Sequence, residues 1–110
     1  MSERKLQNEI RLALGKPHGC VFFRNSVGVF EVWDPKDGGV RVVHAGLCKG
    51  SADIVGIVDG RFTSLEIKTA TGRVSQDQIN WANVVRAHGG FHAVVRSVDE
   101  ALRAVEDARR

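Results

Sequence analysis

Residues 50–68 read GSADIVGIVDGRFTSLEIK, and the pattern of this stretch decides the fold. Two extended runs, Ile54 to Val58 and Phe62 to Lys68, flank the dipeptide Asp59-Gly60. Asp-Gly between such runs is the strongest short-range signal for a two-residue type I′ turn, because both turn positions need a positive φ. The stretch therefore predicts a β-hairpin at the centre of the chain.

The register of this hairpin brings charged residues together at its open end. A two-residue turn pairs Val58 with Arg61 and, counted outward, places Asp53 opposite Glu66, with Lys68 on the same face. Two opposed carboxylates repel unless a cation lies between them or one of them is protonated. Because carboxylate oxygens suit Mg²⁺ or Mn²⁺, we predict a divalent metal site with a lysine beside it. The alternative is a loop-ending Asp and an exposed Glu-x-Lys on a solvated strand face.

The composition fits one small α/β domain spanning residues 1–110. Of the 110 residues, 43% are hydrophobic, which is enough for a core, although a domain of this size would gain from oligomerisation. A net charge of +3 is compatible with a polyanionic partner. With neither a membrane-length apolar run nor a signal peptide, we expect an intracellular, cytoplasmic protein. Cys20 and Cys48 match no zinc spacing and are expected to be reduced core thiols.

Helical and extended patterns lie on both sides of the hairpin. Ser2 to Leu14 reads as a helix with an apolar stripe, and Gly15 fits a C′ residue. Glu9 lies at the rim of that stripe, where it either reaches inward or is an ordinary exposed glutamate. Further elements are expected at Cys20–Phe23, Val27–Trp33, Val40–His44, Phe91–Arg96, and in helices opened by Ser75 and Ser97. This order predicts a mixed α/β sandwich around a central sheet, with the metal site at one sheet edge.

Two further segments leave alternatives open. The turn cluster DPKDGG at 34–39 joins two strands into an accessory flap, whose Phe30 and Trp33 are expected to pack within the protein rather than meet a partner. Gln78 completes an S-x-x-Q capping box with Ser75, and it also lies where its side chain could reach the Lys68 end of the sheet. Capping and positioning of the site are both consistent with the sequence.

The motif letters resemble a known nuclease family. Asp53, a short hairpin and Glu66-x-Lys68 resemble the PD-(D/E)xK nuclease core, and the stretches GLCKGSAD at 46–53 and SQDQ at 75–78 resemble its VRR-NUC (virus-type replication–repair nuclease) branch. The similarity runs from the first helix to about Arg96. One departure is Ala52, where the family has proline, a residue that shapes the loop and is no metal ligand.

The resemblance implies roles for individual residues. It implies a restriction-endonuclease-like core with Asp53, Glu66, Lys68 and Gln78 as catalytic residues. The implied metal ligands are Glu9, Asp53, Glu66 and the backbone carbonyl of Ile67, around Mg²⁺ or Mn²⁺. Glu3 competes with Glu9 for the helix position, but lies in the first turn. The candidate nucleic-acid contacts are Arg24, Asn25, Lys49 and Arg73, although Asn25 would equally hold the loop and the glycines near Lys49 would let the backbone approach a phosphate.

We therefore expect a metal-dependent nuclease that hydrolyses DNA phosphodiester bonds. The chain shows no sequence-reading module, so selectivity would come from DNA structure, such as branched DNA or a Holliday junction. By analogy with small stand-alone members of the family from phages, a homodimeric endonuclease is expected. The alternatives are an inactive nucleic-acid-binding module on the same fold and a hydrolase of small phosphoesters.

Overall fold

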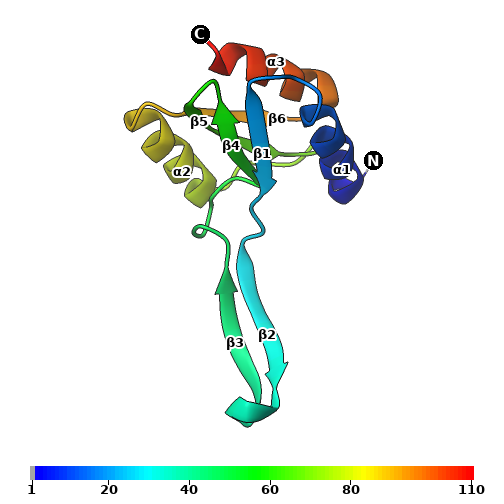
Figure 1. The fold of residues 1–110 in the computed structure, drawn as a ribbon, viewed down its shortest axis with the longest axis vertical. Coiled ribbons are helices and arrows are strands. Elements are labelled where there is room, and N and C mark those ends of the chain that lie inside the picture. Colours follow the sequence, from blue (N-terminus) through cyan, green and yellow to red (C-terminus); the bar gives the residue numbers. More distant parts are fainter. Residues whose placement is uncertain (1) are drawn as a thin grey trace.

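The computed structural model describes residues 2–110, with only the backbone of Asp37 included. Figure 1 shows a mixed α/β body from which one hairpin projects. The elements follow the order predicted from the sequence: α1 Glu3–Leu14, β1 Cys20–Arg24, β2 Gly28–Asp34, a 3-10 turn η1 Pro35–Asp37, β3 Gly39–Ala45, β4 Ile54–Val58, β5 Arg61–Ile67, α2 Gln76–Ala87, β6 Phe91–Val95 and α3 Val98–Ala108. The mixed α/β class is confirmed.

The central hairpin has the predicted register. β4 and β5 pair antiparallel from Val58 with Arg61 to Ile54 with Leu65. The turn residues Asp59 and Gly60 have φ values of 47° and 83°, as a type I′ turn requires. Asp59 is held in addition by Arg109, whose Nη1 lies 3.1 Å from Asp59 Oδ2. The local Asp-Gly signal was therefore sufficient to fix both the turn and the strand alignment.

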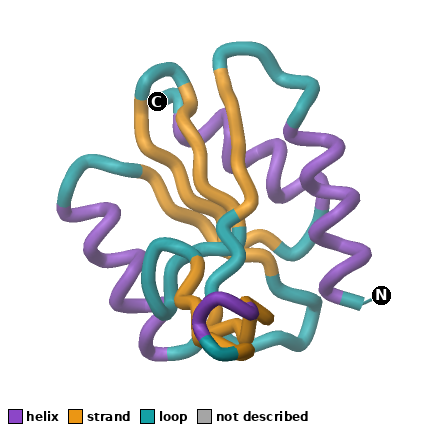
Figure 2. Tube along the Cα trace, turned by 60° about the horizontal axis from the view of Figure 1, so that its bottom comes forward, coloured by secondary structure: helices purple, strands orange, loops and turns teal. Residues whose placement is uncertain are grey.

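The four-stranded sheet has the order β1-β4-β5-β6, with β5 and β6 parallel and the other pairs antiparallel. Helices cover both faces of this sheet (Figure 2). On one face, α1 and α3 pack on each other over a core cluster that includes Ile10, Ile54, Leu65, Ile67 and Val105. On the other face, α2 lies over β5, where Trp81 Nε1 donates to Ser64 Oγ at 3.2 Å. Since β4 and β5 are the two inner strands, the predicted site lies at the end of inner strands rather than at a lateral sheet edge.

Serine caps set the starts of all three helices. The side chains of Ser2, Ser75 and Ser97 each accept a backbone N–H from the first turn of their helix. The expectation for the end of α1 was wrong, because Gly15 is the C-cap with a right-handed φ of −77°. The sequence signals for helix starts were thus more informative than this signal for a helix end.

The strands β2 and β3 form a separate two-stranded sheet, which we call the arm. The arm projects from the body (Figure 1), and the molecule measures 51 × 33 × 28 Å. The Cα radius of gyration is 15.4 Å, against about 13 Å for a compact chain of 100 residues. The prediction that Phe30 and Trp33 pack within the protein is wrong, since they are 48% and 72% exposed.

Candidate active site

The two predicted carboxylates lie at the open end of the central hairpin. Asp53 stands one residue before β4, just beyond the pair Ile54–Leu65 that ends the ladder, and its Oδ2 accepts the backbone N–H of Ile67 at 2.8 Å. Ile67 follows Glu66 on β5, so this hydrogen bond ties the Asp53 carboxylate to the strand that carries Glu66. The backbone of Ile67 is therefore in the site, and the role of its carbonyl stays a prediction.

Glu66 is the most unusual group in the site. Its side chain is almost completely buried, and among the described residues its Oε2 atom has no hydrogen-bond partner. Burial, and then the neighbouring Asp53 carboxyl, raise the pKa of Glu66 from 4.5 to about 9, although Lys68 acts in the opposite direction. An unpartnered buried carboxylate is costly, so this atom calls for a proton or a cation.

Lys68 supplies the positive charge of the site. Its Nζ lies 3.9 Å from Glu66 Oε1, and its side chain is 14% exposed. The backbone of Lys68 is held to β6 by a hydrogen bond from its N–H to the carbonyl of Val95. Beyond it, the Arg96 guanidinium donates to the carbonyls of Thr69 and Gly72 at 2.6 and 2.8 Å. Arg96 thus stabilises the loop that follows Lys68, a role that the sequence did not indicate.

Gln78 caps α2 and contacts the site at the same time. Its Oε1 accepts the backbone N–H of Ser75 at 2.9 Å, and its Nε2 donates to Glu66 Oε1 at 3.1 Å. Because the Ser75 N–H is only a donor, it requires the amide oxygen, and the amide NH₂ is left pointing at Glu66. The two alternatives left open by the sequence are therefore both present, and the cap orients the side chain for the second role.

Asn25 holds the loop before Asp53. Its Nδ2 donates to Ser51 Oγ and to the carbonyl of Ala52, both at 2.8 Å, while its Oδ1 accepts the N–H of Leu47 at 3.0 Å. Its backbone N–H also donates to the carbonyl of Asp53 at 2.8 Å. Both amide hydrogens of the buried side chain are thus used inside the protein. Of the two proposed roles, the structure favours loop support over contact with nucleic acid.

The first helix contributes different residues from those expected. Within the described part of the chain, Gln7, and not Glu9, lines the cleft that contains Asp53 and Glu66. The charge of Glu3, one turn before Gln7, contributes to the raised pKa of Glu66. On a helix, residues 3 and 7 share a face, whereas residue 9 lies on the other side of the apolar stripe. The structure thus brings Gln7 to the cleft, while the role of Glu9 as a metal ligand stays a prediction.

The cleft has a volume of about 300 Å³ and a mostly polar lining. Arg24 lines it and is exposed, as a contact with a charged ligand requires. Lys49 instead pairs with Asp77 at 3.5 Å on the surface, and Arg73 is exposed in the loop before α2. The glycines near Lys49 were expected to let the backbone approach a phosphate. At Gly50 the structure does not support this expectation, because a Cβ atom added there would overlap the backbone of Asp77. The lining residues are Gln7, Arg24, Asn25, Ser26, Val27, Gly50, Ser51, Asp53, Glu66 and Gln78.

The donor set fits a hard divalent cation that keeps part of its water shell. Residues 2–110 contain no group of three or more His, Cys, Asp or Glu side chains placed to hold a metal. Two side-chain carboxylates are nevertheless what Mg²⁺ usually takes from a protein, since it retains several waters. The unpartnered Glu66 Oε2 beside Asp53 is the specific observation in favour of this fit.

Other candidate residues lie outside the cleft. His92 is buried with its Nδ1 2.6 Å from Ser64 Oγ, and burial, reinforced by Arg86, lowers its pKa to about 4. This pair is an internal polar contact under α2. Only the pairing of β5 with β6 brings the two residues together, so no local sequence pattern indicates it. Of the cysteines, Cys20 packs against the core as expected, but Cys48 is exposed, and both are free thiols.

No protein-family model matches this chain, and no curated protein matches it either. Within residues 2–110, none of the helices has the length and apolar character needed to cross a membrane.

Proposed function

We propose that this chain is a metal-dependent nuclease that hydrolyses DNA phosphodiester bonds, with a PD-(D/E)xK core of the VRR-NUC type. The observation that carries the proposal is the buried Oε2 of Glu66, which lacks a partner among the described residues beside Asp53 and within reach of Lys68. A buried carboxylate beside a half-buried one, next to an ammonium group, is an arrangement suited to binding a cation and stabilising developing negative charge.

The residues of the chain have distinct tasks in this proposal. Asp53 and Glu66 would hold Mg²⁺ or Mn²⁺, which supplies Lewis-acid polarisation of the phosphate and a lower pKa for bound water. Gln78 keeps Glu66 Oε1 in place through a hydrogen bond, so that Oε2 remains directed away from it. Arg24, which lines the cleft, would contact a phosphate of the DNA backbone.

Lys68 is assigned the charge-stabilising role. Water adds to phosphorus, one P–O ester bond breaks, and the products are a phosphate monoester and a hydroxyl group. The ammonium of Lys68 orients the attacking oxygen and offsets the charge that builds on the phosphate oxygens. The cleft carries no module for reading bases, so we propose selectivity for DNA structure, with branched DNA as the preferred substrate.

The test is cleavage of labelled linear duplex, single-stranded, flapped and four-way-junction DNA with Mg²⁺, Mn²⁺ or EDTA. We expect metal-dependent cutting that falls roughly 10²–10⁴-fold in Lys68→Ala. The matched control is Lys16→Ala, which removes an exposed lysine outside the cleft and should cut like the wild type.

Three outcomes would count against the proposal in different ways. Undiminished cutting by Lys68→Ala would contradict the site assignment. Metal-independent DNA binding without any cutting would favour the inactive binding module. Hydrolysis of a small phosphodiester that DNA does not inhibit would favour a hydrolase of small phosphoesters.

A further inference from the structure

β1 is an edge strand of the four-stranded sheet. Among the described strands it pairs with β4 alone, in the order β1-β4-β5-β6. Just past its end, Asn25 donates its backbone N–H to the carbonyl of Asp53 at 2.8 Å. Because hydrogen-bonded positions alternate along an antiparallel pair, the backbone groups of Phe23 and Val21 also face β4, and those of Phe22 point away from the sheet. The outer side of β1 therefore carries N–H and C=O groups that no described strand uses.

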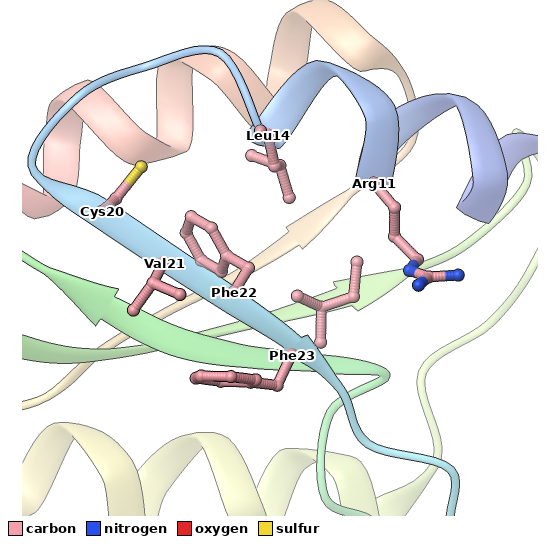
Figure 3. Close-up of a pocket in the computed structure, with 8 residues that line it drawn as sticks. Arg11, Leu14, Cys20, Val21, Phe22 and Phe23 are labelled. Atoms are coloured by element: carbon pink, nitrogen blue, oxygen red, sulfur yellow. The ribbon is translucent and has the colours of Figure 1, made fainter.

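A groove follows this outer side of β1. It has a volume of about 300 Å³, and its lining includes four consecutive residues of the strand, 20–23. Since consecutive residues of a strand point to opposite faces, such a lining lies along the edge of the strand and not on one face. The other wall comes from the end of α1, with Arg11, Leu14 and Gly15. Figure 3 shows Phe22 and Leu14 between strand and helix, and Arg11 extending from α1 toward the sheet.

The edge lacks the features that usually protect an exposed strand. Residues 20–23 read CVFF, without lysine or proline, and their pairing with β4 is continuous, without a bulge. Val21 and Phe23 lie on the side of β1 opposite to Phe22 (Figure 3) and are 47% and 59% exposed. An uncharged, apolar edge of this kind is a template for pairing with a further strand.

The charge beside the edge is entirely positive. Residues 11–24 contain Arg11, Lys16 and Arg24 and no acidic residue, which gives this segment a charge of +3. Arg11 is exposed, and it forms no ion pair with another described residue. By alternation along β1, Arg24 lies on the same side of the sheet as Phe22, which is the side of α1. Acidic side chains on that side of an added strand would meet opposite charges.

We propose that an extended acidic segment of another protein adds as a fifth strand to the outer edge of β1. Its acidic side chains face Arg11 on the α1 side, and its alternate, apolar side chains lie beside Val21 and Phe23. In this mode of recognition the main-chain hydrogen bonds give affinity and the alternate side chains give specificity. The groove and the carboxylate cleft share no lining residue, so the inference does not rest on the proposed nuclease activity.

Two other occupants fit this edge less well. The phosphates of a nucleic acid accept hydrogen bonds but donate none, so they would leave the outward C=O groups of β1 unpaired. The β1 edge of a second copy would bring two basic segments, residues 11–24 of each chain, next to each other, where like charges repel. An acidic peptide supplies donors, acceptors and the opposite charge together.

The experiment measures peptide binding to the whole chain by fluorescence anisotropy. The probe is a labelled peptide of about ten residues in which glutamate and valine alternate, compared with a peptide that has lysine for glutamate. We expect the glutamate peptide to bind at least about tenfold more tightly than the lysine peptide. Arg11→Glu should weaken binding of the glutamate peptide about tenfold and strengthen that of the lysine peptide. The matched control is Arg103→Glu, an exposed arginine of α3 outside the groove, which should change neither affinity more than about twofold.

N-methylation of the peptide tests the strand pairing with the wild-type chain. A strand presents alternate N–H groups to its neighbour. In antiparallel pairing with β1, the peptide residue opposite Phe22 exchanges both hydrogen bonds with it, and that residue is a glutamate because it lies on the α1 side. We expect N-methyl groups on the glutamates to abolish binding, and N-methyl groups on the valines to change the affinity by less than about threefold. Far-UV circular dichroism checks that the variants are folded.

Four results would overturn the proposal. The first is that neither unmodified peptide binds the wild-type chain at about 1 mM. The second is equal binding of the two N-methylated peptides, because strand pairing uses only one set of N–H groups. The third is that Arg11→Glu weakens binding of duplex DNA and leaves the peptide affinity unchanged, which would assign the edge to nucleic acid. The fourth is that Arg11→Glu changes only the sedimentation of the chain alone, which would assign the edge to a second copy.

Discussion

The two hairpins of this protein have similar pairing and opposite surroundings. β4 and β5 lie between β1 and β6, with helices over both faces, whereas β2 and β3 pair only with each other. Val58 in the central hairpin is completely buried, while Val42 in the arm is 58% exposed. Turn residues and alternation therefore set the pairing in both hairpins, but neighbouring elements decide what each hairpin buries.

Each hairpin also contains a departure from ordinary burial. The central hairpin buries a carboxylate, Glu66, and the arm exposes a tryptophan, Trp33. Buried charges and exposed apolar patches are the informative cases, because ordinary burial explains neither. The buried carboxylate is the observation behind the proposed metal site, whereas the exposed tryptophan leaves the surface of the arm open to solvent.

The largest loss of stability is expected from a substitution that adds a side-chain atom between β1 and β4. In Gly56→Ala, the new Cβ atom would overlap the carbonyl oxygen of Val21 and approach the Phe22 ring. We expect a loss of roughly 3–4 kcal/mol in the free energy of unfolding, measured by urea titration. The control is Gly38→Ala at the arm tip, where no described atom lies within 4 Å of the new Cβ and φ is +85°. Its cost of about 1–2 kcal/mol should be confined to the arm turn, and equal losses would contradict the comparison.

The next effect is a pH dependence of the stability, which we assign to Glu66 in the central hairpin. The pKa of Glu66 is raised from 4.5 to about 9, so the folded state holds a proton that the unfolded state releases, and stability falls as pH rises through this window. The lowered pKa of His92, about 4, acts in the opposite direction only below about pH 6.5. We therefore expect the metal-free melting temperature to fall between pH 6.5 and 9.

Two additions sharpen this measurement. Mg²⁺ should raise the melting temperature more at pH 8.5 than at pH 6.5, because the cation competes with the proton for Glu66. Glu66→Gln should abolish both the slope and the metal effect. A wild-type slope that survives in Glu66→Gln would assign the titration to another group.

A smaller difference is expected from the same substitution in the two hairpins. Val58→Ala removes two buried methyl groups and should cost about 2 kcal/mol of unfolding free energy, including the cavity that remains. Val42→Ala, in the exposed arm, should cost less than about 0.5 kcal/mol when measured at a concentration at which the chain is monomeric. Similar costs in chemical denaturation would mean that the arm is covered within its own chain.

The smallest effect concerns the cap that orients Gln78. Ser75→Ala should cost about 1 kcal/mol and also lower DNA cleavage severalfold, because the Gln78 amide loses part of the capping box that holds it toward Glu66. Ser97→Ala removes the equivalent serine cap of α3, a helix that, among the described residues, makes no hydrogen bond to Asp53 or Glu66. Ser97→Ala should cost the same unfolding free energy and leave DNA cleavage unchanged. A similar fall in cleavage in both variants would mean that cleavage responds to lost stability and not to the position of Gln78.

Sequence reasoning reached the fold class and the pair Asp53–Glu66 because both depend on local signals. An Asp-Gly turn aligns its strands by counting, and serine caps mark helix starts. It missed Gln7 because the angle at which α1 crosses the sheet, and not the apolar stripe alone, decides which flank of the helix faces the cleft. It also missed Arg96, whose partners Thr69 and Gly72 lie 27 and 24 residues away in the chain.

The sequence by itself determined the two hairpins, the register of the central one and the helix starts, since each is set by residues within a few positions of one another. Tertiary structure alone decided that Glu66 is buried without a partner for Oε2 among the described residues and that Asn25 is a loop clamp. It also decided that Trp33 is exposed on an isolated arm. Burial and long-range hydrogen bonds depend on which elements pack together, and that depends on the whole chain at once.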